Sequence, residues 1–548
     1  MDRREFFTLR RRSVDTSPRP FAGLRQINTG IAQYAGPWTT NEVVHLLKRT
    51  MFGAKKADID FFKGMSMSQA VDALLTAPAS PAAPLKNYSG ADAVAAGATW
   101  VNNVSEDEDV NAGRVSSYKS WWTGVMLNQN RSILEKLLLF WHNHFSTETA
   151  VYLRGTYAYK HNELLRQNAL GNFKQLVRKV TLDHAMLFYL NGYLNVKEAP
   201  DENYARELME LFTLGKENNP NYTEDDVKAA AKVLTGWKIK FTDDTVYFDP
   251  AQHDTGNKTF SSFFSGTTIT GLSGATAGDG ELDALLNMIF NKQTEVSEFI
   301  IRKIYRFFCY YTIDADTETN VIKPLAQLFR TNNWDIKLVL TTLFKSEHFF
   351  DPLNQGCLIK SPIDLMVGLC REFNIVFPAG YADQYNMWDF IRSEAGEIQQ
   401  NVGDPPSVSG WPAYYQVPGF HELWINHATL PRRNVFSDVL IQNGYTRSGQ
   451  KIQIDPVAFA KTLPNPGDPN ALINDSLDVL YRVPVSQASK DVIKKQILLS
   501  NQDLDYYWSN AWNAHIASPG DTTAYNVVYT RLQTLYKYFM NLAEYQLA

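Results

Sequence analysis

The stretch Ser132-Ile133-Leu134-Glu135-Lys136-Leu137-Leu138-Leu139-Phe140-Trp141 (residues 132–141) decides the fold class of this 548-residue chain. Its first four residues have the Ser-x-x-Glu spacing of a capping box, which predicts that a helix begins at Ile133. From Leu137 to Trp141 this helix is apolar on every face, as expected of an element that is buried on all sides. We therefore predict a helical protein with this segment at its centre.

Helical signals also dominate on both sides of this segment. Thr40 is the expected cap of a first helix, and Thr223 caps a second helix whose acidic first turn faces the helix dipole. That second helix is expected to end at Gly236. Further helices are expected at residues 281–289, 295–311, 321–330, 336–345, 363–372, 486–499 and 524–546. The predicted fold is mainly α, a multi-helix globular core with an irregular, partly β insertion and C-terminal helices packed back on it.

Composition divides the chain into five segments. They are a basic flexible arm (1–38), a first part of the helical core (39–240) with a flexible insertion near 77–110, an irregular or β insertion (241–280), a second part of the core (281–435) and a C-terminal helical region (436–548). The insertion near 77–110 is rich in Ala, Pro, Gly and Asp, which is typical of solvated chain. Because one compact core usually stops growing near about 250–300 residues, two or three packed units are expected.

Charge and motif content exclude several classes of function. The net charge of −5 offers no basic field for phosphates, so we expect no nucleic-acid partner. Cys309, Cys357 and Cys370 lack CxxC spacing and are expected to be small buried side chains. The sequence has no run of about 18 apolar residues that would predict a transmembrane segment. It also has neither a GxxxxGK[ST] loop nor a GxSxG elbow, so a nucleotide cofactor and an ordinary serine hydrolase are not expected.

The first residues bear on localisation. Asp2-Arg3-Arg4-Glu5-Phe6-Phe7 looks like the core of a twin-arginine export signal. Such a signal needs an apolar stretch next, whereas Arg10, Arg11, Arg12, Asp15 and two prolines follow here. A cytoplasmic location with a flexible basic arm is therefore the preferred interpretation, and an exported or periplasmic protein is the alternative.

The segment from Asn203 to Glu210 carries the richest polar signal in the chain. At about 100° per residue, Asn203, Arg206, Glu207 and Glu210 share one arc of a helix. One interpretation is a catalytic site in which Glu207 and Glu210 act as an acid/base pair or hold a metal ion. Arg206 would give electrostatic support there, and Asn203 would bind the ligand. The alternative is a plain amphipathic helix with an Arg206–Glu210 pair that contributes only about 0.2–0.5 kcal/mol.

Histidines supply candidate metal ligands. His142 and His144 lie about 200° apart on a regular helix and cannot share one ion, and His144 is the better candidate because it lies at the helix exit. His253 and Asp254 lie in a Gly/Asn/Thr loop, with Asp249 before it and the candidate binding residue Lys258 after it. The set Asp249, His253 and Asp254 would suit one hard or borderline divalent ion. The alternatives are a core histidine at His144, and a surface histidine at His253 followed by an Asx turn at Asp254.

Two further segments contain proline at informative positions. Trp411, between Gly410 and Pro412, is a candidate binding residue in a rigid wall beside a pocket, and plain structural packing is the preferred interpretation. Lys360-Ser361-Pro362 predicts a helix start with Pro at its first position rather than a nucleophile with its base.

Several of these segments resemble the motifs of one family, the bacterial domain-of-unknown-function 1800 family, and they occur in family order. The similar segments are His45–Gly53, Phe140–Phe145, Asn203–Gly215 with Tyr222–Val227, His253–Thr259, Lys360–Pro362 and Pro405–Pro412. The resemblance covers residues 41 to 440, with weaker echoes beyond, and departs from the family at Ala413-Tyr414, where Gly-Gly is frequent. It implies no assigned reaction. Relatives often look exported and are often encoded beside an alkaline-phosphatase-like protein of unknown function, which implies such a partner.

Two functional hypotheses follow. The first is a metal-assisted hydrolase-like enzyme in which Glu207, Glu210 and Arg206 face His144 and the His253–Asp254 loop. The second is a non-enzymatic structural or partner-binding protein, whose aromatic surface docks another chain and whose polar residues form a buried network. A fully satisfied buried network also specifies a unique core, so polar motifs alone do not separate the two hypotheses.

Overall fold

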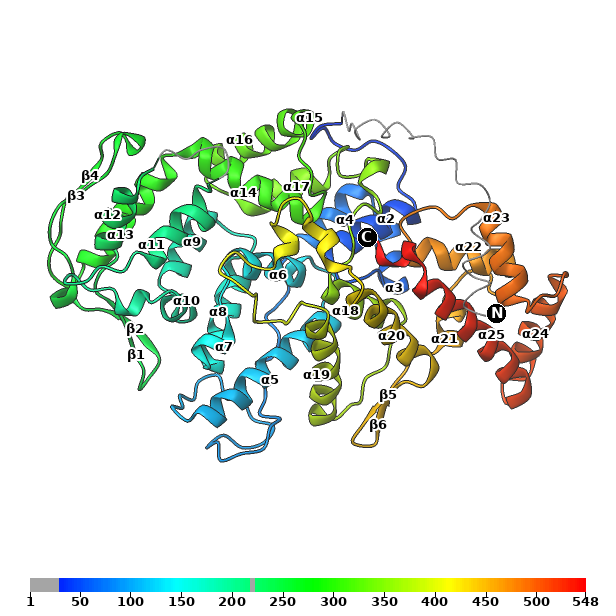
Figure 1. Ribbon diagram of the computed structural model, residues 1–548. Helices are drawn as coiled ribbons and strands as arrows, with labels where there is room; N and C mark the ends of the chain where they lie inside the picture. Colours follow the sequence, from blue (N-terminus) through cyan, green and yellow to red (C-terminus); the bar gives the residue numbers. More distant parts are fainter. Residues whose placement is uncertain (1–28, 217–221) are drawn as a thin grey trace.

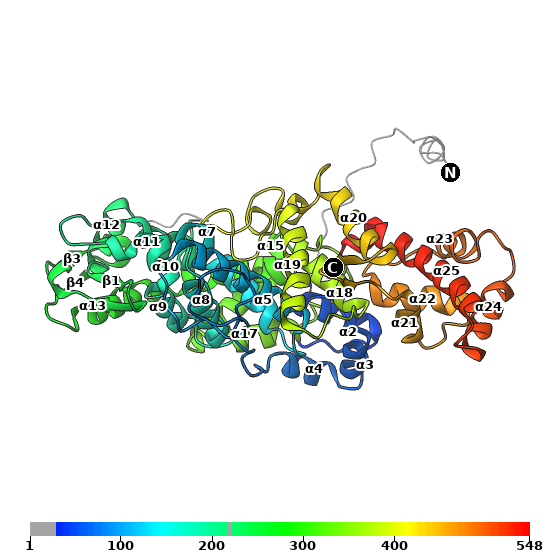
Figure 2. The same cartoon turned by 90° about the horizontal axis from the view of Figure 1, so that it is seen from below.

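The computed structural model describes residues 29–216 and 222–548 of the chain (Figure 1). It is 57% helical, and only 5% lies in small antiparallel strand pairs, which confirms the prediction of a mainly α protein with small β insertions. The buried apolar side chains form one continuous cluster that extends from Val43 to Tyr545. The molecule is elongated in both views, with α12, α13 and β3–β4 at one end and α22–α25 at the other (Figures 1 and 2).

Helix α6 (Leu134–His144) is the buried centre that the sequence predicts. Its apolar run from Leu137 to Trp141 has no more than a trace of exposed surface. The helix begins one residue later than expected, because Ile133 is the cap residue and the hydroxyl of Ser132 accepts from the Leu134 N–H at 3.3 Å. Helix α6 contacts α8 (Gly155–Asn168), which in turn contacts α5 (Glu108–Leu127).

The other elements follow the predicted order. The first half of the chain has α2 (Thr40–Thr50), α3 (Lys56–Lys63), α4 (Met67–Leu74), α7 (Thr149–Tyr152), α9 (Phe173–Thr181), α10 (His184–Tyr189), α11 (Asn203–Glu207), the π turn η2 (Leu208–Thr213) and α12 (Glu224–Val233). The second half has α13 (Ala277–Phe290), α14 (Gln293–Phe308), α15 (Ala315–Thr317), α16 (Lys323–Thr331), α17 (Ile336–Phe344), α18 (Pro362–Glu372), α19 (Tyr381–Glu397), α20 (Thr429–Gln442), α21 (Pro456–Lys461), α22 (Pro469–Leu480), α23 (Gln487–Val492), α24 (Tyr506–Ala517) and α25 (Thr522–Asn541).

Helix starts agree well with their sequence signals. Thr223 caps α12, and Asp226 completes a capping box there. Ser361 caps α18 with Pro362 at the first helical position, which confirms the interpretation of that segment as a helix start. The cap of α2 is Thr39 rather than Thr40, because Glu42 stands three residues after Thr39 and closes a capping box with it.

Three antiparallel strand pairs interrupt the helices. Strand β1 (Trp237–Lys240) ends just before the insertion that the sequence predicts at 241–280 and pairs with β2 (Thr245–Phe248) inside it. Strands β3 (Lys258–Thr259) and β4 (Thr268–Ile269) pair with each other within the insertion. The third pair, β5 (Tyr445–Arg447) with β6 (Gln450–Ile452), lies in the C-terminal region, for which only helices are expected. Its two-residue turn, Ser448-Gly449, has positive φ at both positions, which is the turn type that suits the twist of a hairpin.

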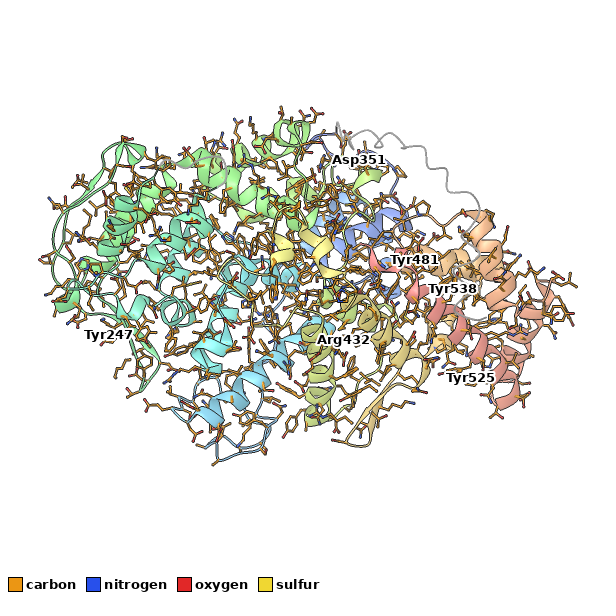
Figure 3. The ribbon with its side chains drawn as sticks, viewed as in Figure 1. Tyr247, Asp351, Arg432, Tyr481, Tyr525 and Tyr538 are labelled. Atoms are coloured by element: carbon orange, nitrogen blue, oxygen red, sulfur yellow. The ribbon has the colours of Figure 1, made fainter. Side chains whose placement is uncertain are left out.

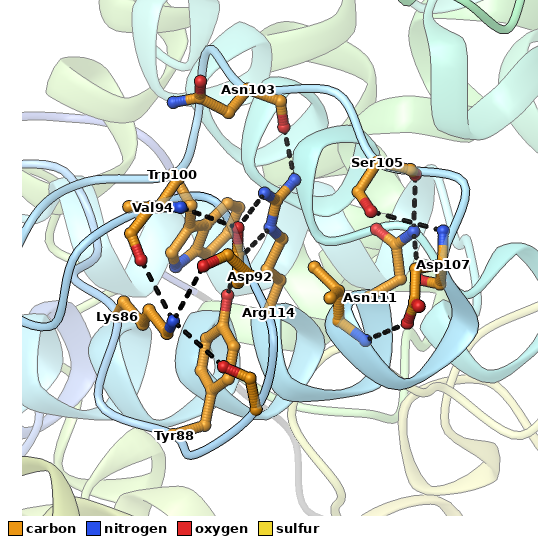
Figure 4. A network of polar contacts seen from close by, with 12 residues as sticks. Lys86, Tyr88, Asp92, Val94, Trp100, Asn103, Ser105, Asp107, Asn111 and Arg114 are labelled. Carbon is orange, nitrogen blue, oxygen red and sulfur yellow. Dashed lines mark hydrogen bonds and ion pairs between the residues drawn. The ribbon is translucent and has the colours of Figure 1, made fainter.

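The insertion near 77–110 folds against α5 (Figure 4). The ammonium group of Lys86 donates to the backbone oxygens of Asp92 and Val94 at 3.2 and 3.0 Å. Asp92 forms an ion pair with Arg114 of α5 at 2.9 Å, and both side chains are 1% exposed. Burial alone would raise the pKa of Asp92, but hydrogen bonds from Arg114 and Tyr88 lower it to about 2. This ion pair therefore connects the insertion to the core.

The C-terminal helices pack back onto the rest of the molecule, since α22 packs against α2 and α25 packs against α20. All three cysteines are free; Cys309 and Cys370 are buried, as expected, whereas Cys357 is half-buried.

Among the helices of residues 29–216 and 222–548, none has both the length and the apolar character needed to cross a membrane.

Candidate functional site

The segment with the predicted acid pair is a helix that changes its winding. Asn203 is the first residue of α11, and after Glu207 the chain continues into the wider π turn η2. The N–H of Leu214 there donates to the carbonyl of Met209, five residues earlier, at 2.9 Å. A π turn holds more residues than an α turn, so the side chains after Glu207 point in other directions than they would on a regular helix. Glu210 therefore does not share the face that a regular helix would give it with Asn203, Arg206 and Glu207. Wide turns of this kind are frequent at functional sites.

Arg206 connects α11 to the first turn of α12. Its guanidinium makes two hydrogen bonds to Glu224, at 2.9 and 2.6 Å, and an ion pair with Glu202 at 2.9 Å. Glu210, the partner expected for Arg206 in a plain amphipathic helix, forms its ion pair with Lys216 at 2.7 Å instead. These contacts are partly exposed to solvent, so each contributes little to stability.

Glu207 differs from the acids around it. Its side chain is half-buried, and no hydrogen bond to its carboxylate is found within the described parts of the chain. Burial, followed by the charge of Glu210, raises the pKa of Glu207 above its ordinary value. Asn203, at the start of the same helix, is exposed. Burial and the neighbouring charge of Glu210 therefore favour the protonated form of Glu207.

His144 lies in the aromatic core beneath the π turn. Its Nε2 is 3.1 Å from the carbonyl oxygen of Phe212, and the ring of Phe145 packs against it at 4.4 Å. Since a carbonyl only accepts hydrogen bonds, Nε2 carries the ring proton and Nδ1 is a buried lone pair without a donor among the described residues. Burial shifts the pKa of His144 well below its ordinary value, so the ring is neutral.

His253 belongs to a buried network centred on Glu281. Its Nε2 is 3.0 Å from Glu281 Oε1, and its Nδ1 is 2.9 Å from the carbonyl oxygen of Thr235. Lys258 donates to Glu281 Oε2 at 2.7 Å, and the N–H of Leu272 donates to Oε1 at 2.7 Å. Burial alone would raise the pKa of Glu281, but these hydrogen bonds lower it below its ordinary value.

The network is closed off from solvent. His253, Lys258 and Glu281 have side chains that are at most 1% exposed. The two nitrogens of His253 lie beside Glu281 Oε1 and the carbonyl oxygen of Thr235. An ionised Glu281 that accepts from Lys258 and from the N–H of Leu272 is well satisfied even though it is buried, which is the condition for a buried charge to persist.

Asp254 forms the Asx turn that the sequence offers as an alternative. Its Oδ1 accepts the N–H of Gly256 at 2.8 Å, two residues further on. Its own N–H donates to the hydroxyl of Thr235 at 2.9 Å, and its carbonyl oxygen accepts from Lys258. The Asp254 carboxylate therefore shapes the loop that places His253 and Lys258 beside Glu281.

Trp411 connects two motif segments that are far apart in the sequence. Its N–H donates to the side-chain oxygen of Asn143 at 2.9 Å. Gly410 makes this approach possible, because it has φ +94° and a Cβ at this position would lie 2.3 Å from that oxygen. The Trp411 ring is buried and lies 6.0 Å from the ring of His142.

These residues therefore lie in several distinct arrangements. His253 and Lys258 meet at Glu281, His144 contacts the turn that follows Glu207, and Trp411 contacts the helix of His144 at Asn143. Over residues 29–216 and 222–548, no group of three or more His, Cys, Asp or Glu side chains is placed to hold a metal ion. The sequence does not identify Glu281 as a site residue. The one sequence feature that could have indicated it is its position as an acid at the start of a largely apolar predicted helix.

The fold and these contacts define a mainly helical protein whose motif segments are joined by buried polar contacts. The chain belongs to the family described as protein of unknown function (DUF1800), whose model matches residues 45–547. This confirms the resemblance seen in the motifs and extends it beyond residue 440. No curated protein and no solved structure matches the chain significantly.

Proposed function

We propose that this chain is a binding protein, in which the histidine and acid motifs hold the structure together, rather than a metal-assisted hydrolase. The observation that carries this proposal is the state of Glu281. This carboxylate is completely buried and already accepts from His253, Lys258 and the N–H of Leu272. A metal ion at His253 would have to displace these donors, so the network is better suited to structure than to metal binding.

A pair of measurements tests this proposal. We expect Glu281→Gln to lower the free energy of unfolding by about 3–5 kcal/mol, because it leaves Lys258 buried without its counter-charge. Glu224→Gln, which removes the exposed partner of Arg206, is the matched control and should cost less than about 1 kcal/mol. Metal analysis of the purified protein completes the test. A stoichiometric divalent ion that is lost in Glu281→Gln would contradict the proposal.

The molecule also has an apolar surface that supports a protein partner. Helix α24 and its flanks expose large side chains at one end of the molecule, namely Leu504, Tyr506, Tyr507 and Ile516. Exposed apolar patches are typical of protein–protein contacts, and these side chains are the candidates for such a contact. We propose as partner the alkaline-phosphatase-like protein that the family resemblance implies. A pull-down with the purified partner tests this, with Tyr506→Ser expected to weaken capture and the exposed Tyr247→Ser of β2 as control.

Glu207 favours a second candidate function, acid/base catalysis with Glu210, which a divalent metal ion could assist. Its raised pKa and the π turn beside it are the specific observations that support this role. Phosphate-ester and carboxylic-ester substrates are suitable probes for hydrolytic activity. An activity that Glu207→Gln abolishes, at unchanged stability, would favour this function over the binding protein.

A further inference from the structure

A small cavity near the centre of the molecule is lined by basic side chains. It lies where α2, α6, the start of α18 and the segment 413–424 meet, and we call it the cation cavity. Its walls include Lys48, Arg49, Lys136, Lys360, Ser361 and His421. Figure 1 places α2, α6 and α18 in the middle of the fold.

Two of the buried cations around this cavity have carboxylate partners. Lys48 forms an ion pair with Glu372 at 2.7 Å, and its ammonium also donates to a backbone carbonyl. Lys136 forms an ion pair with Asp364, which also accepts from the hydroxyl of Ser361. In both pairs the carboxylate neutralises the ammonium, so neither lysine has an uncompensated charge.

Arg49 and Lys360 are different, because neither has an ion pair with a carboxylate in the described parts of the chain, although they are only 3% and 5% exposed. One nitrogen of Arg49 donates to the carbonyl of Asn354 at 2.8 Å, but its Nε and Nη1 are buried without a partner. The ammonium of Lys360 lies over the ring of Tyr545 at 3.9 Å. A buried cation without a counter-charge is rare in proteins, since the desolvation of the charge is left uncompensated.

His421 adds a neutral donor to the same wall. Its Nδ1 accepts the backbone N–H of Ile359 at 3.1 Å, so in the neutral ring the proton is on Nε2. Burial, followed by the charge of Arg49, lowers the pKa of His421 to about 4, which keeps the ring neutral at pH 7. The Nε2 atom is buried and has no acceptor among the described residues. Arg49, Lys360 and His421 thus line one cavity, together with Asp364 and the C-terminal residue Ala548. No ion pair between any of the three and a carboxylate is found among the described residues.

A third unpaired cation lies directly behind this wall. Arg433 donates to the carbonyl oxygen of Lys360 at 2.7 Å and to the side chain of Gln546 at 2.8 Å, while its Nη1 has no partner among the described residues. Burial lowers the pKa of Arg433 to about 9. Lys48, Lys136, Arg49, Lys360 and Arg433 therefore outnumber the side-chain carboxylates Glu372 and Asp364 at this point, although the whole chain carries a net charge of −5.

We propose that the cation cavity binds a small oxyanion, that is, a phosphate, sulfate or carboxylate group, between Arg49, Lys360 and His421. The planar fork of a guanidinium fits such groups with two parallel hydrogen bonds, and an ammonium adds a compact charge. The cavity volume is about 40 Å³, whereas a cavity that holds one water needs roughly 10–15 Å³. The cavity therefore holds one small oxyanion rather than a nucleotide.

The sequence supports this location in one further way. Lys48 and Arg49 belong to the first family-like motif, Lys360 and Ser361 belong to another, and Ala413 and Tyr414 follow the last one directly. Two motifs that are more than 300 residues apart in the sequence thus line one cavity. This inference names the class of ligand for the proposed binding protein and rests on that function.

The test measures thermal unfolding of the full-length protein at constant ionic strength in phosphate, sulfate, acetate and chloride. A ligand that binds only the folded state raises the unfolding temperature in a saturable way. We expect a rise of several degrees with at least one oxyanion and none with chloride. The comparison of phosphate, sulfate and acetate identifies which oxyanion fits. An equal effect of chloride, or no effect of any oxyanion on protein that native mass spectrometry shows to be free of bound anion, would overturn the proposal.

Two variants locate the effect. Lys360→Met keeps a long stem on the ring of Tyr545, and Arg49→Gln keeps a donor for the carbonyl of Asn354, so both should fold. Each should weaken oxyanion binding at least about tenfold, since each removes a charge from the cavity. Arg432→Gln is the control, because Arg432 is next to Arg433 in sequence but its side chain is 52% exposed (Figure 3).

The same variants contain an internal check on folding. In buffer without oxyanions, Lys360→Met should be at least as stable as the wild type, because it removes a buried charge that has no partner. A variant that is stable but keeps the wild-type response to phosphate would overturn the proposal. The result is independent of Glu281→Gln and of metal analysis, so failure of the oxyanion site and failure of the proposed binding function can be told apart.

Discussion

The backbone N–H of Trp411 and the side-chain oxygen of Asn143 are 2.9 Å apart, although the two residues are separated by 268 positions in the sequence. This bond joins the segment before Pro412 to the end of α6, a buried helix of the core. It requires a residue without a side chain at position 410, because the backbone of Gly410 lies against Asn143.

Gly410→Ala should therefore be strongly destabilising. The new Cβ would lie 2.3 Å from the Asn143 oxygen, and the φ of +94° is unfavourable for alanine. We expect a loss of about 3 kcal/mol or more in urea unfolding, since both strain and a broken buried hydrogen bond contribute. Gly449→Ala separates the two effects, because its φ is +78° and nothing lies within 4 Å of the new Cβ. An equal loss in both variants would show that the contact with Asn143 is unimportant.

Low pH should lower the free energy of unfolding through the protonation of Asp92. The pKa of Asp92 is lowered to about 2 in the folded state, so the folded protein binds fewer protons there than the unfolded chain, whose aspartates titrate near 3.9. The stability from this group is fully present above about pH 4 and is lost as the pH falls toward 2, in total about 2 kcal/mol. Equilibrium unfolding against pH should show this loss in the wild type and not in Asp92→Asn.

The buried histidines predict a second loss of stability, at milder pH. The pKa of His144 in the folded protein is well below its ordinary value, mainly because of burial, so below about pH 6.5 the unfolded chain binds a proton that the folded protein does not. Stability should therefore fall by about 1.4 kcal/mol per pH unit for this residue as the pH drops from 6 to 5. His144→Gln should reduce the slope by that amount, with the exposed His427→Gln as control. An unchanged slope in His144→Gln would contradict the neutral, buried state of this ring.

The raised pKa of Glu207 predicts a loss of stability at high pH rather than at low pH. It is half-buried beside Glu210 and has a raised pKa, so the folded protein binds a proton there more readily than the unfolded chain does. The stability from this protonation is present at low pH and is lost as the pH rises through the folded-state pKa. Glu207→Gln should therefore be more stable than the wild type at pH 8, by less than about 1 kcal/mol for a partly exposed group. Equal stability at pH 8 would show that Glu207 is freely solvated.

The sequence predicts the helices well and the contacts between them poorly. The caps at Thr223 and Ser361 are recognised because a cap depends on residues within one turn of the chain. The π turn after Glu207 is not, since its backbone hydrogen bonds have no residue signature, and this is why the expected Arg206–Glu210 pair is replaced by Arg206–Glu224.

The same distinction applies to the site residues. His253 and Lys258 are found from the local loop pattern, but their partner Glu281 lies on another helix, and only the fold brings it near. The cation cavity is even less visible, because Arg49 and Lys360 come from opposite halves of the chain. A charged residue in a buried helix such as α2 is the one sequence signal that would direct attention to it.

The ion pair between Asp92 and Arg114 also determines how the chain can be shortened. Arg114 is part of α5, whereas Asp92 lies in the low-complexity insertion that an experimenter would remove first to obtain a minimal fragment. Deletion of that insertion would leave a buried guanidinium with no carboxylate, and the loss would fall on the core helix rather than on the loop. A truncation series should therefore treat residues 77–114 as one indivisible unit.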